Sequence, residues 1–465
     1  MTIVRALCAW LAVCGLVGCA SFAANGSGDA TPPQSAPMAA GSASSSQYVQ
    51  HVVIVIQENR SFDNLFATFP GADGATSGKM STGKTVKLAV SDLKSPCDFG
   101  HSRSGFLKAY DKGKMDGFNL EGGSKKCPGQ AGRRPYQYVN PTQIAPYWDI
   151  AGQYVLGDHM FQTQGSGSFT SHQDLIAGGT RINQQESLVD FPSKAPWGCD
   201  APSGTTTSLV KTNGSEPAPR KLVYLYHKGP FPCLSYATMR DLLDAKGVSW
   251  KYYSPPVVNG TGGLWNGFEA IAAVRNGSEW GTNVVSPETK IFDDISGGTL
   301  PSVSWIVPDD GNSDHPGTAS DKGPSWVASV VNAIGQSQYW PTTAIVVVWD
   351  DWGGFYDHVP PPFFDNYGGL GFRVPMLIVS PYARETSPTQ ASYVSHTQYE
   401  FGSILKFVED TFGLGRLYTT DSRSSSIVDS FDFTQSPRTF STIPSQYSAR
   451  YFRRQPPSYE PVDSE

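Results

Sequence analysis

The stretch His51-Val-Val-Ile-Val-Ile-Gln-Glu-Asn-Arg-Ser-Phe-Asp-Asn64 decides the fold of this chain. From Val52 to Ile56 it is an unbroken β-branched run, which is typical of a strand buried on both faces of a parallel sheet. The run ends at Gln57, directly before Glu58 and Asn59. Ligands of open α/β sheets bind beyond the carboxyl ends of the strands. We therefore expect Glu58 and Asn59, which both offer oxygen ligands, to lie at a site.

A second segment repeats this arrangement. The apolar run 344–348 leads into Trp349-Asp350-Asp351, so two carboxylates again follow a buried strand. Either motif alone is better explained as a polar loop at a strand end. Together they predict that Glu58, Asn59, Asp350 and Asp351 assemble one cation site at the same edge of one sheet.

Length and composition place the chain among globular proteins. It has 465 residues, of which 39% are hydrophobic and 16% charged, and its net charge is −6. No run of Lys and Arg suggests a nucleic-acid surface, so nucleic acid is excluded as a partner. We predict an α/β fold: a single large domain over residues 49–445, with a mostly parallel central sheet flanked by helices.

The N-terminal segment predicts export. Arg5 precedes an apolar stretch too short to span a bilayer, and Leu16-Val17-Gly18-Cys19 resembles a bacterial lipobox. We expect residues 1–19 to be a lipoprotein-type signal peptide with Cys19 lipidated; a plain secretory signal is the alternative. Residues 20–48 are expected to be a flexible linker and 446–465 a C-terminal tail. The protein would be a periplasmic or outer-membrane lipoprotein, or secreted.

Four cysteines follow Cys19, namely Cys97, Cys127, Cys199 and Cys233. An even number in an oxidising compartment indicates two disulfides, for which three connectivities exist. We expect sequence neighbours to pair, giving Cys97–Cys127 and Cys199–Cys233.

The segment 164–178 predicts a turn that enters a helix. Gly165 and Gly167 permit the turn, and Ser171 and Asp174 have the spacing of a capping box. A hydroxyl at such a place faces backbone N–H groups that stabilise an oxyanion or a phosphoryl group. The hydroxyls in position are those of Ser168, Thr170 and Ser171. The alternative is that they only cap the helix.

Four of the eight histidines lie in loops near predicted strand or helix ends: His101, His315, His358 and His396. If they converge at the same edge of the sheet, they can donate hydrogen bonds to phosphate oxygens or protonate a leaving group.

The chain resembles the bacterial phosphoesterase family of acid phosphatases and phosphatidylcholine-type phospholipases C, within the alkaline phosphatase superfamily. The resemblance rests on Glu58-Asn-Arg-Ser-Phe-Asp63, on the thirteen residues from Trp349 to Pro361, and on Gly167-Ser-Phe-x-x-His172 with Leu175-Ile-Ala-Gly178. These motifs spread over residues 50 to 415. The first two are long and specific, and the third is weaker.

The resemblance implies roles for particular residues. It implies that Glu58, Asn59, Asp350 and Asp351 hold a metal ion and that Ser168 is the nucleophile. It also implies histidines around the phosphate, which correspond to His315, His358 and His396 and, less securely, His101. The family pattern has His where this chain has Asn64, and Pro-Asn where it has Thr170-Ser171. Thr170 therefore remains an alternative nucleophile.

These roles together predict metal-dependent hydrolysis of phosphate esters through a phospho-serine intermediate. The oxygen and nitrogen ligands suit one divalent ion, which could be Ca²⁺, Mg²⁺, Mn²⁺ or Zn²⁺. Because nothing resembles the extra C-terminal domains of some family phospholipases, we favour acid-phosphatase-like cleavage of small phosphomonoesters.

Two alternatives remain. In the first, the enzyme is a phospholipase C, and Trp352, Phe355 and Tyr356 cradle a choline head group through cation–π contacts. In the second, the protein is a non-catalytic, surface-tethered lipoprotein that binds a ligand. Contact with a membrane is expected only through a lipid anchor or a lipid substrate.

Overall fold

A computed structural model describes residues 44–462 of the chain except 125, 126, 128, 130, 214–220, 259, 260, 363–368 and 388. The expected signal peptide, Cys19 and nearly all of the expected linker lie outside these residues. The linker's last residues form a short 3-10 helix, Ser45–Gln47, in which Ser45 accepts a hydrogen bond from Thr411 at 3.0 Å. Ser45, within the segment that we expected to be a linker, therefore takes part in the packed structure.

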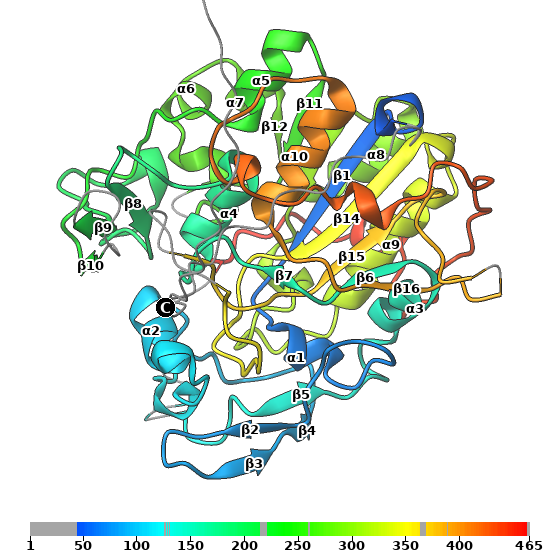
Figure 1. Cartoon of the computed structure of the whole chain (residues 1–465). Coiled ribbons are helices and arrows are strands. Elements are labelled where there is room, and N and C mark those ends of the chain that lie inside the picture. The colour runs from blue at the N-terminus through cyan, green and yellow to red at the C-terminus, as the bar shows by residue number, and fades with distance from the viewer. Residues whose placement is uncertain are drawn as a thin grey trace, which may run out of the picture. The chain divides into compact units, whose positions relative to one another are not determined.

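The described part of the chain is organised around one large sheet (Figure 1). Its eight strands lie in the order β12 (Val284–Val285), β11 (Trp250–Tyr253), β13 (Val303–Ile306), β1 (His51–Gln57), β14 (Thr343–Trp349), β15 (Met376–Val379), β6 (Val155–Gly157) and β16 (Tyr393–Ser395). Only β15 runs antiparallel to its neighbours. The predicted α/β class and mostly parallel sheet are confirmed.

The two β-branched runs form the centre of this sheet. β1 and β14 pair in parallel from His51 opposite Thr343 to Gln57 opposite Trp349. Every residue of β14 and every residue of β1 except His51 is buried. Strands that are covered on both faces have no solvent side, which is why their sequences are continuously apolar.

Helices cover the sheet in two groups, and helices of the same group contact one another (Figure 1). One group contains α4 (Ser168–Ala177), α5 (Met239–Lys246) and α10 (Phe401–Phe412); the other contains α3 (Ala145–Gln153), α8 (Ile291–Gly297), α9 (Gly323–Gly335) and α11 (Ala449–Phe452). The remaining helices, α1 (Phe62–Phe66), α2 (Arg103–Tyr110), α6 (Ala272–Arg275) and α7 (Glu279–Thr282), lie in the connections. None of the described helices is long and apolar enough to cross a membrane.

The C-terminal segment takes part in this packing. Phe452 of α11 is buried and lies edge-on to Trp326 of α9, with 5.3 Å between ring centroids. Val462 is also buried. Two residues of the segment that we expected to be a tail therefore contribute to the core.

Smaller sheets stand apart from the main one. An antiparallel sheet comprises β8 (Glu186–Val189), β9 (Ser208–Asn213) and β10 (Lys221–Leu225). The pairs are β2 (Ser77–Lys79) with β3 (Thr85–Lys87), β4 (Ala89–Ser91) with β5 (Gln137–Val139), and β7 (Met160–Phe161) with β17 (Tyr399–Glu400). Both expected disulfides, Cys97–Cys127 and Cys199–Cys233, are confirmed. They are consistent with an exported protein.

Candidate active site

The structure brings the two acidic segments together. Because β1 and β14 are paired in register up to Gln57 and Trp349, the residues that follow them leave the sheet at the same level. The backbone N–H of Asn59 donates to Oδ1 of Asp350 at 3.2 Å. The side chains of Glu58, Asn59, Asp350 and Asp351 are all fully buried. They form one compact polar group, as expected from the two motifs.

Backbone geometry at this group is unusual and depends on a glycine. Asn59 has a φ of 42°, in the left-handed region that asparagine tolerates better than most residues. Gly353 also has a positive φ, and its N–H donates to Oδ1 of Asp351 at 2.8 Å. A Cβ atom at Gly353 would lie 2.2 Å from the carbonyl oxygen of Asn59. Only a glycine at position 353 therefore lets the turn after β14 approach Asn59 so closely.

Ser168 is the first residue of α4, and its hydroxyl lies against this acidic group. It accepts a hydrogen bond from Nδ2 of Asn59 at 3.1 Å and donates to Oδ2 of Asp351 at 3.2 Å. The start of a helix also presents backbone N–H groups and a partial positive charge. A hydroxyl in this place can attack phosphorus while the helix stabilises the phosphoryl oxygens.

The expected capping box at Ser171 and Asp174 is wrong. The helix begins four residues earlier than that box predicts, after Gly167, whose extended backbone serves as the N-cap. Ser171 lies within the first turn, and its hydroxyl donates to the carbonyl of Gly167 at 3.2 Å. Asp174 instead accepts hydrogen bonds from Gln164.

Thr170, the alternative nucleophile, points elsewhere. Its hydroxyl donates to Oγ of Ser166 at 2.8 Å and lies 3.2 Å from the carbonyl oxygen of Gly167. These contacts direct it toward the turn before α4. The geometry therefore favours Ser168 over Thr170 as the nucleophile.

His172 is a site residue that we did not predict from the sequence. Its Nε2 donates to Oε1 of Glu58 at 2.8 Å and lies 3.8 Å from Oδ2 of Asp350. Burial lowers the pKa of His172 to about 4, although the charge of Asp350 opposes this shift, so the ring is neutral at pH 7. The spacing from Ser168 contained a signal, because residues four apart share one face of a helix.

His101 and His315 lie beside the same group. Nδ1 of His101 is 2.8 Å from the carbonyl oxygen of Phe99, so this nitrogen carries the proton. Its Nε2 is then the acceptor, 3.0 Å from Nδ2 of Asn59, and it lies 3.8 Å from Oδ2 of Asp351. The ring of His315 is 6.3 Å from that of His101. His315 therefore neighbours a histidine that contacts the acidic group.

The structure does not bring His358 and His396 to this group. His358 is bonded through Nδ1 to Asp63 at 2.8 Å and through Nε2 to Asp73 at 3.2 Å. His396 is bonded through Nδ1 to Asp158 at 2.8 Å. The expected convergence of four histidines is thus wrong for these two. Sequence position could not reveal this, since each of them also follows or precedes a regular element.

His358 belongs to a second acidic cluster that is already balanced in charge. Its carboxylates, Asp63 and Asp357, are buried, and the guanidinium of Arg373 lies 2.9 Å from Asp357 and 3.4 Å from Asp63. The side chains of Asp63, Asp357 and His358 are close enough to one another to hold a metal ion. Because Arg373 supplies the compensating charge, the cluster is better explained as an internal ion-pair network.

The group around Ser168 fits a divalent cation better. Glu58, His172 and Asp350 offer ligand atoms that all lie within 4.8 Å of one another. Oδ1 of Asn59 and Oδ2 of Asp350 are buried and have no hydrogen-bond partner among the described residues. Buried polar atoms of this kind usually mark an absent ligand, and oxygen donors suit hard divalent ions. The donor set does not select one ion.

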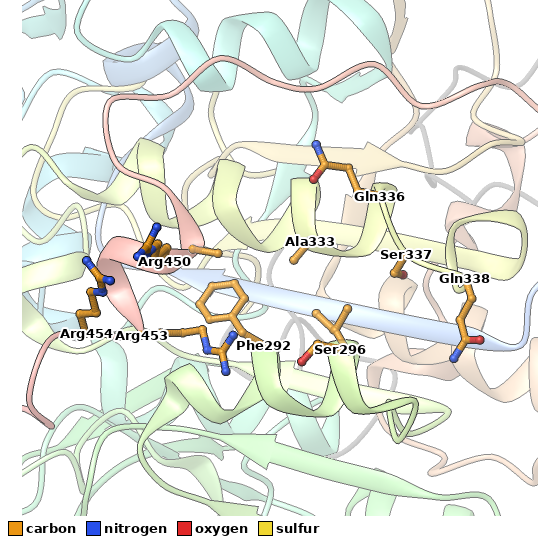
Figure 2. A pocket seen from close by; sticks show the side chains of 11 residues that line it. Phe292, Ser296, Ala333, Gln336, Ser337, Gln338, Arg450, Arg453 and Arg454 are labelled. Carbon is orange, nitrogen blue, oxygen red and sulfur yellow. The ribbon is translucent and has the colours of Figure 1, made fainter.

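Two other features are separate from this site. Trp352, Phe355 and Tyr356 are buried in aromatic clusters, with Trp352 4.8 Å from Phe372, so the expected choline cradle at these residues is wrong. A cavity of about 750 Å³ lies between α8, α9 and α11, with Phe292 at its centre and Arg450, Arg453 and Arg454 at one end (Figure 2). None of the predicted site residues lines it.

Buried carboxylates and an amide at the carboxyl ends of two parallel strands, with a hydroxyl at a helix start against them, are the residue types that a metal-assisted hydrolase centre requires. Comparison with known proteins agrees with this class. The Phosphoesterase family model matches residues 49–415, and the chain belongs to this family. It is therefore a phosphoric ester hydrolase, which sets aside the non-catalytic alternative.

Several relatives are phospholipases C. Phospholipase C B of Mycobacterium tuberculosis is 25% identical over 84% of this chain and 78% of its own. The non-hemolytic phospholipase C of Pseudomonas aeruginosa is 25% identical over 79% of this chain and 54% of its own. A Vibrio parahaemolyticus protein in the alkaline phosphatase superfamily is 11% identical over 82% of this chain and 72% of that chain, with a TM-score of 0.37.

Proposed function

We propose that this enzyme hydrolyses phosphodiesters of the phospholipase C type, with Ser168 as nucleophile. The observation that carries the proposal is the position of the Ser168 hydroxyl, which lies within 3.2 Å of both Asn59 and Asp351 at the start of α4. The choice of a diester over a monoester is supported by the relatives, which include phospholipases C that this chain spans to 78% of their length.

The chain's own residues supply the following chemistry. Oγ of Ser168 attacks phosphorus and loses its proton toward Oδ2 of Asp351, and the bond from phosphorus to the leaving alcohol breaks. The N-terminus of α4 stabilises the phosphoryl oxygens. His315, or His101 once a second proton occupies its Nε2, protonates the leaving oxygen, and a water molecule then releases the phosphoryl group from Ser168.

A divalent cation would be held by Glu58, Asn59, Asp350 and Asp351, with His172 orienting Glu58. When bound, it supplies Lewis acidity that favours the alkoxide form of serine and offsets charge on the phosphoryl group. Tethering of the enzyme to a membrane through Cys19 is a separate proposal, which lipid labelling of the exported protein would test.

The test compares two chromogenic substrates on one purified sample. The protein is treated with a chelator and then supplied separately with Ca²⁺, Mg²⁺, Mn²⁺ or Zn²⁺. Faster cleavage of p-nitrophenylphosphorylcholine than of p-nitrophenyl phosphate is the expected result. The opposite preference would establish the acid-phosphatase activity that we favoured from the sequence, and would refute the phospholipase C proposal.

A further inference from the structure

The three-stranded sheet β8–β10 is tied directly to the turn that carries Ser168. The connection is made by Asp190, which follows β8 and has a φ of 59°. Its backbone N–H donates to Oγ of Ser166 at 2.7 Å. Its carboxylate accepts from the backbone N–H of Arg103 at 2.5 Å and from the hydroxyl of Tyr224 at 2.7 Å. Asp190 is therefore held in a strained conformation by three segments.

Such a fixed left-handed residue determines where the next side chain points. Phe191 is only partly buried, and its ring is edge-on to His101 with 6.5 Å between centroids. A Cβ atom built on Gly167 would lie 3.0 Å from Cε2 and Cζ of Phe191. The ring thus covers the residue that immediately precedes Ser168.

Trp197 extends this aromatic surface. It is also partly exposed, and its ring centroid is 6.3 Å from that of Phe191. The chain next to it is fixed, because Gly198 has a φ of 62° and a Cβ atom there would lie 2.5 Å from the carbonyl of Glu269. Cys199 follows and is disulfide-bonded to Cys233.

We propose that Phe191 and Trp197 form a specificity wall that contacts the organic group of the phosphodiester, and that Asp190 is the positioning residue of this wall. The inference rests on the proposed function, and it names residues of the connection between β8 and β9 that the chemistry at Ser168 does not use. Aromatic faces attract methylated ammonium groups and apolar groups, whereas a phosphomonoester offers neither on its non-leaving oxygens. The wall therefore raises selectivity for the diester.

The experiment measures kcat/KM of the full-length, metal-loaded enzyme for three substrates. These are p-nitrophenylphosphorylcholine, its uncharged 3,3-dimethylbutyl analogue and p-nitrophenyl phosphate. For Phe191→Ala and Trp197→Ala, the ratio of kcat/KM for the choline ester to that for the monoester should fall about 3- to 30-fold, which is the range of one cation–π contact. Phe191→Tyr should restore the ratio. A smaller loss with the uncharged analogue than with the choline ester would assign the contact to charge, and an equal loss would assign it to apolar packing.

Phe231→Ala is the matched control, because Phe231 is an exposed phenylalanine of the same insertion, the segment 181–235 between α4 and α5. It should leave the ratio unchanged. Asp190→Ala should lower the ratio as Phe191→Ala does, and Asp190→Asn, which tolerates the same backbone conformation, should largely retain it. Thermal unfolding of each variant verifies that it is folded.

The wall is refuted if the wild-type enzyme cleaves the choline ester and the ratio is the same in the folded Phe191→Ala and Trp197→Ala variants. The proposed function itself fails if the wild-type enzyme prefers the monoester or cleaves neither substrate. Binding of phosphocholine, followed by tryptophan fluorescence, gives a readout that does not require turnover. Wild-type protein should show saturable quenching that Trp197→Phe abolishes, and quenching unaffected by that substitution contradicts the wall.

Discussion

The hydroxyl of Ser168 lies 3.2 Å from Oδ2 of Asp351, although 183 residues separate the two in the sequence. One residue opens a helix and the other lies two residues past the end of the central strand β14. This proximity joins the proposed nucleophile to the proposed cation-binding group.

Removal of the Ser168 hydroxyl should abolish turnover. Ser168→Ala is expected to lower kcat by roughly three orders of magnitude or more, since no other hydroxyl replaces the nucleophile. Thr170→Ala should retain activity within about tenfold, because Thr170 bonds to Ser166 and Gly167 instead. Steady-state kinetics and thermal unfolding of both variants provide the measurement. If Thr170→Ala is inactive and Ser168→Ala is active, we have chosen the wrong hydroxyl.

His172 should control metal affinity. Its ring holds Oε1 of Glu58 in place, and loss of such a partner typically weakens metal binding about 10- to 100-fold. Calorimetric titration of chelator-treated His172→Ala with Mn²⁺ tests this expectation. His159→Ala is the control, since His159 is bonded to Asp73 and not to Glu58. Equal affinities in wild type and His172→Ala would contradict the orienting role.

A bound cation should stabilise the fold. Three carboxylates are buried around Asn59, and a ligand that binds only the folded state adds about 2.7 kcal/mol at 100 times its Kd. Unfolding temperature should therefore rise when a divalent ion is added to chelator-treated protein. The rise should be absent in Asp350→Ala. An equal rise in that variant would place the stabilising ion elsewhere.

Arg373 should be essential for stability. Its guanidinium is fully buried between Asp63 and Asp357, and breaking such a pair leaves uncompensated charge that costs about 3–5 kcal/mol. Urea unfolding of Arg373→Met measures this loss. Lys94→Met, which removes an exposed pair with Asp321, should change stability much less. Comparable losses of unfolding free energy in the two variants would mean that burial of the Arg373 network adds nothing to stability.

Stability should also depend on pH through His358. Burial lowers the pKa of His358, but hydrogen bonding to Asp63 and the charges of Asp63 and Asp357 outweigh it and raise the pKa to about 8. A raised pKa means that the folded state binds the proton more tightly. The stabilisation by protonated His358 is complete below pH 6.5, the ordinary pKa of histidine, and it is lost as the pH rises through about 8.

After allowance for screening of a partly exposed side chain, the loss should be roughly 1 kcal/mol. Urea unfolding should show that the free energy of unfolding differs less between pH 6 and pH 9 for His358→Gln than for wild type. His51→Gln should not reduce the loss, because burial lowers the pKa of His51 and its contribution has the opposite sign. An unchanged difference in His358→Gln would show that other groups control the profile.

The sequence was most informative where structure is local. The β-branched runs of β1 and β14 predicted buried parallel strands, and the polar residues after them predicted where the cation group forms. Both disulfides followed from export and from sequence proximity of the cysteines.

Long-range contacts could not be predicted in this way. His358 and His396 follow the same local pattern as His101, yet they bond to Asp63, Asp73 and Asp158, which come from distant segments. His172 was overlooked because its partner, Glu58, is 114 residues away. The strained backbone of Asp190 has no sequence signature beyond the tolerance of Asp for that region.

Asp190 joins β8–β10 to the turn before Ser168, whereas the cation group comes from β1 and β14, outside that insertion. The proposed wall places substrate preference in this insertion and bond cleavage outside it. Phe191 and Trp197 can be replaced while Asp190 is kept, so that its bond to Ser166 and the turn before Ser168 are preserved. This division makes the insertion the place to begin when redirecting the enzyme toward new esters.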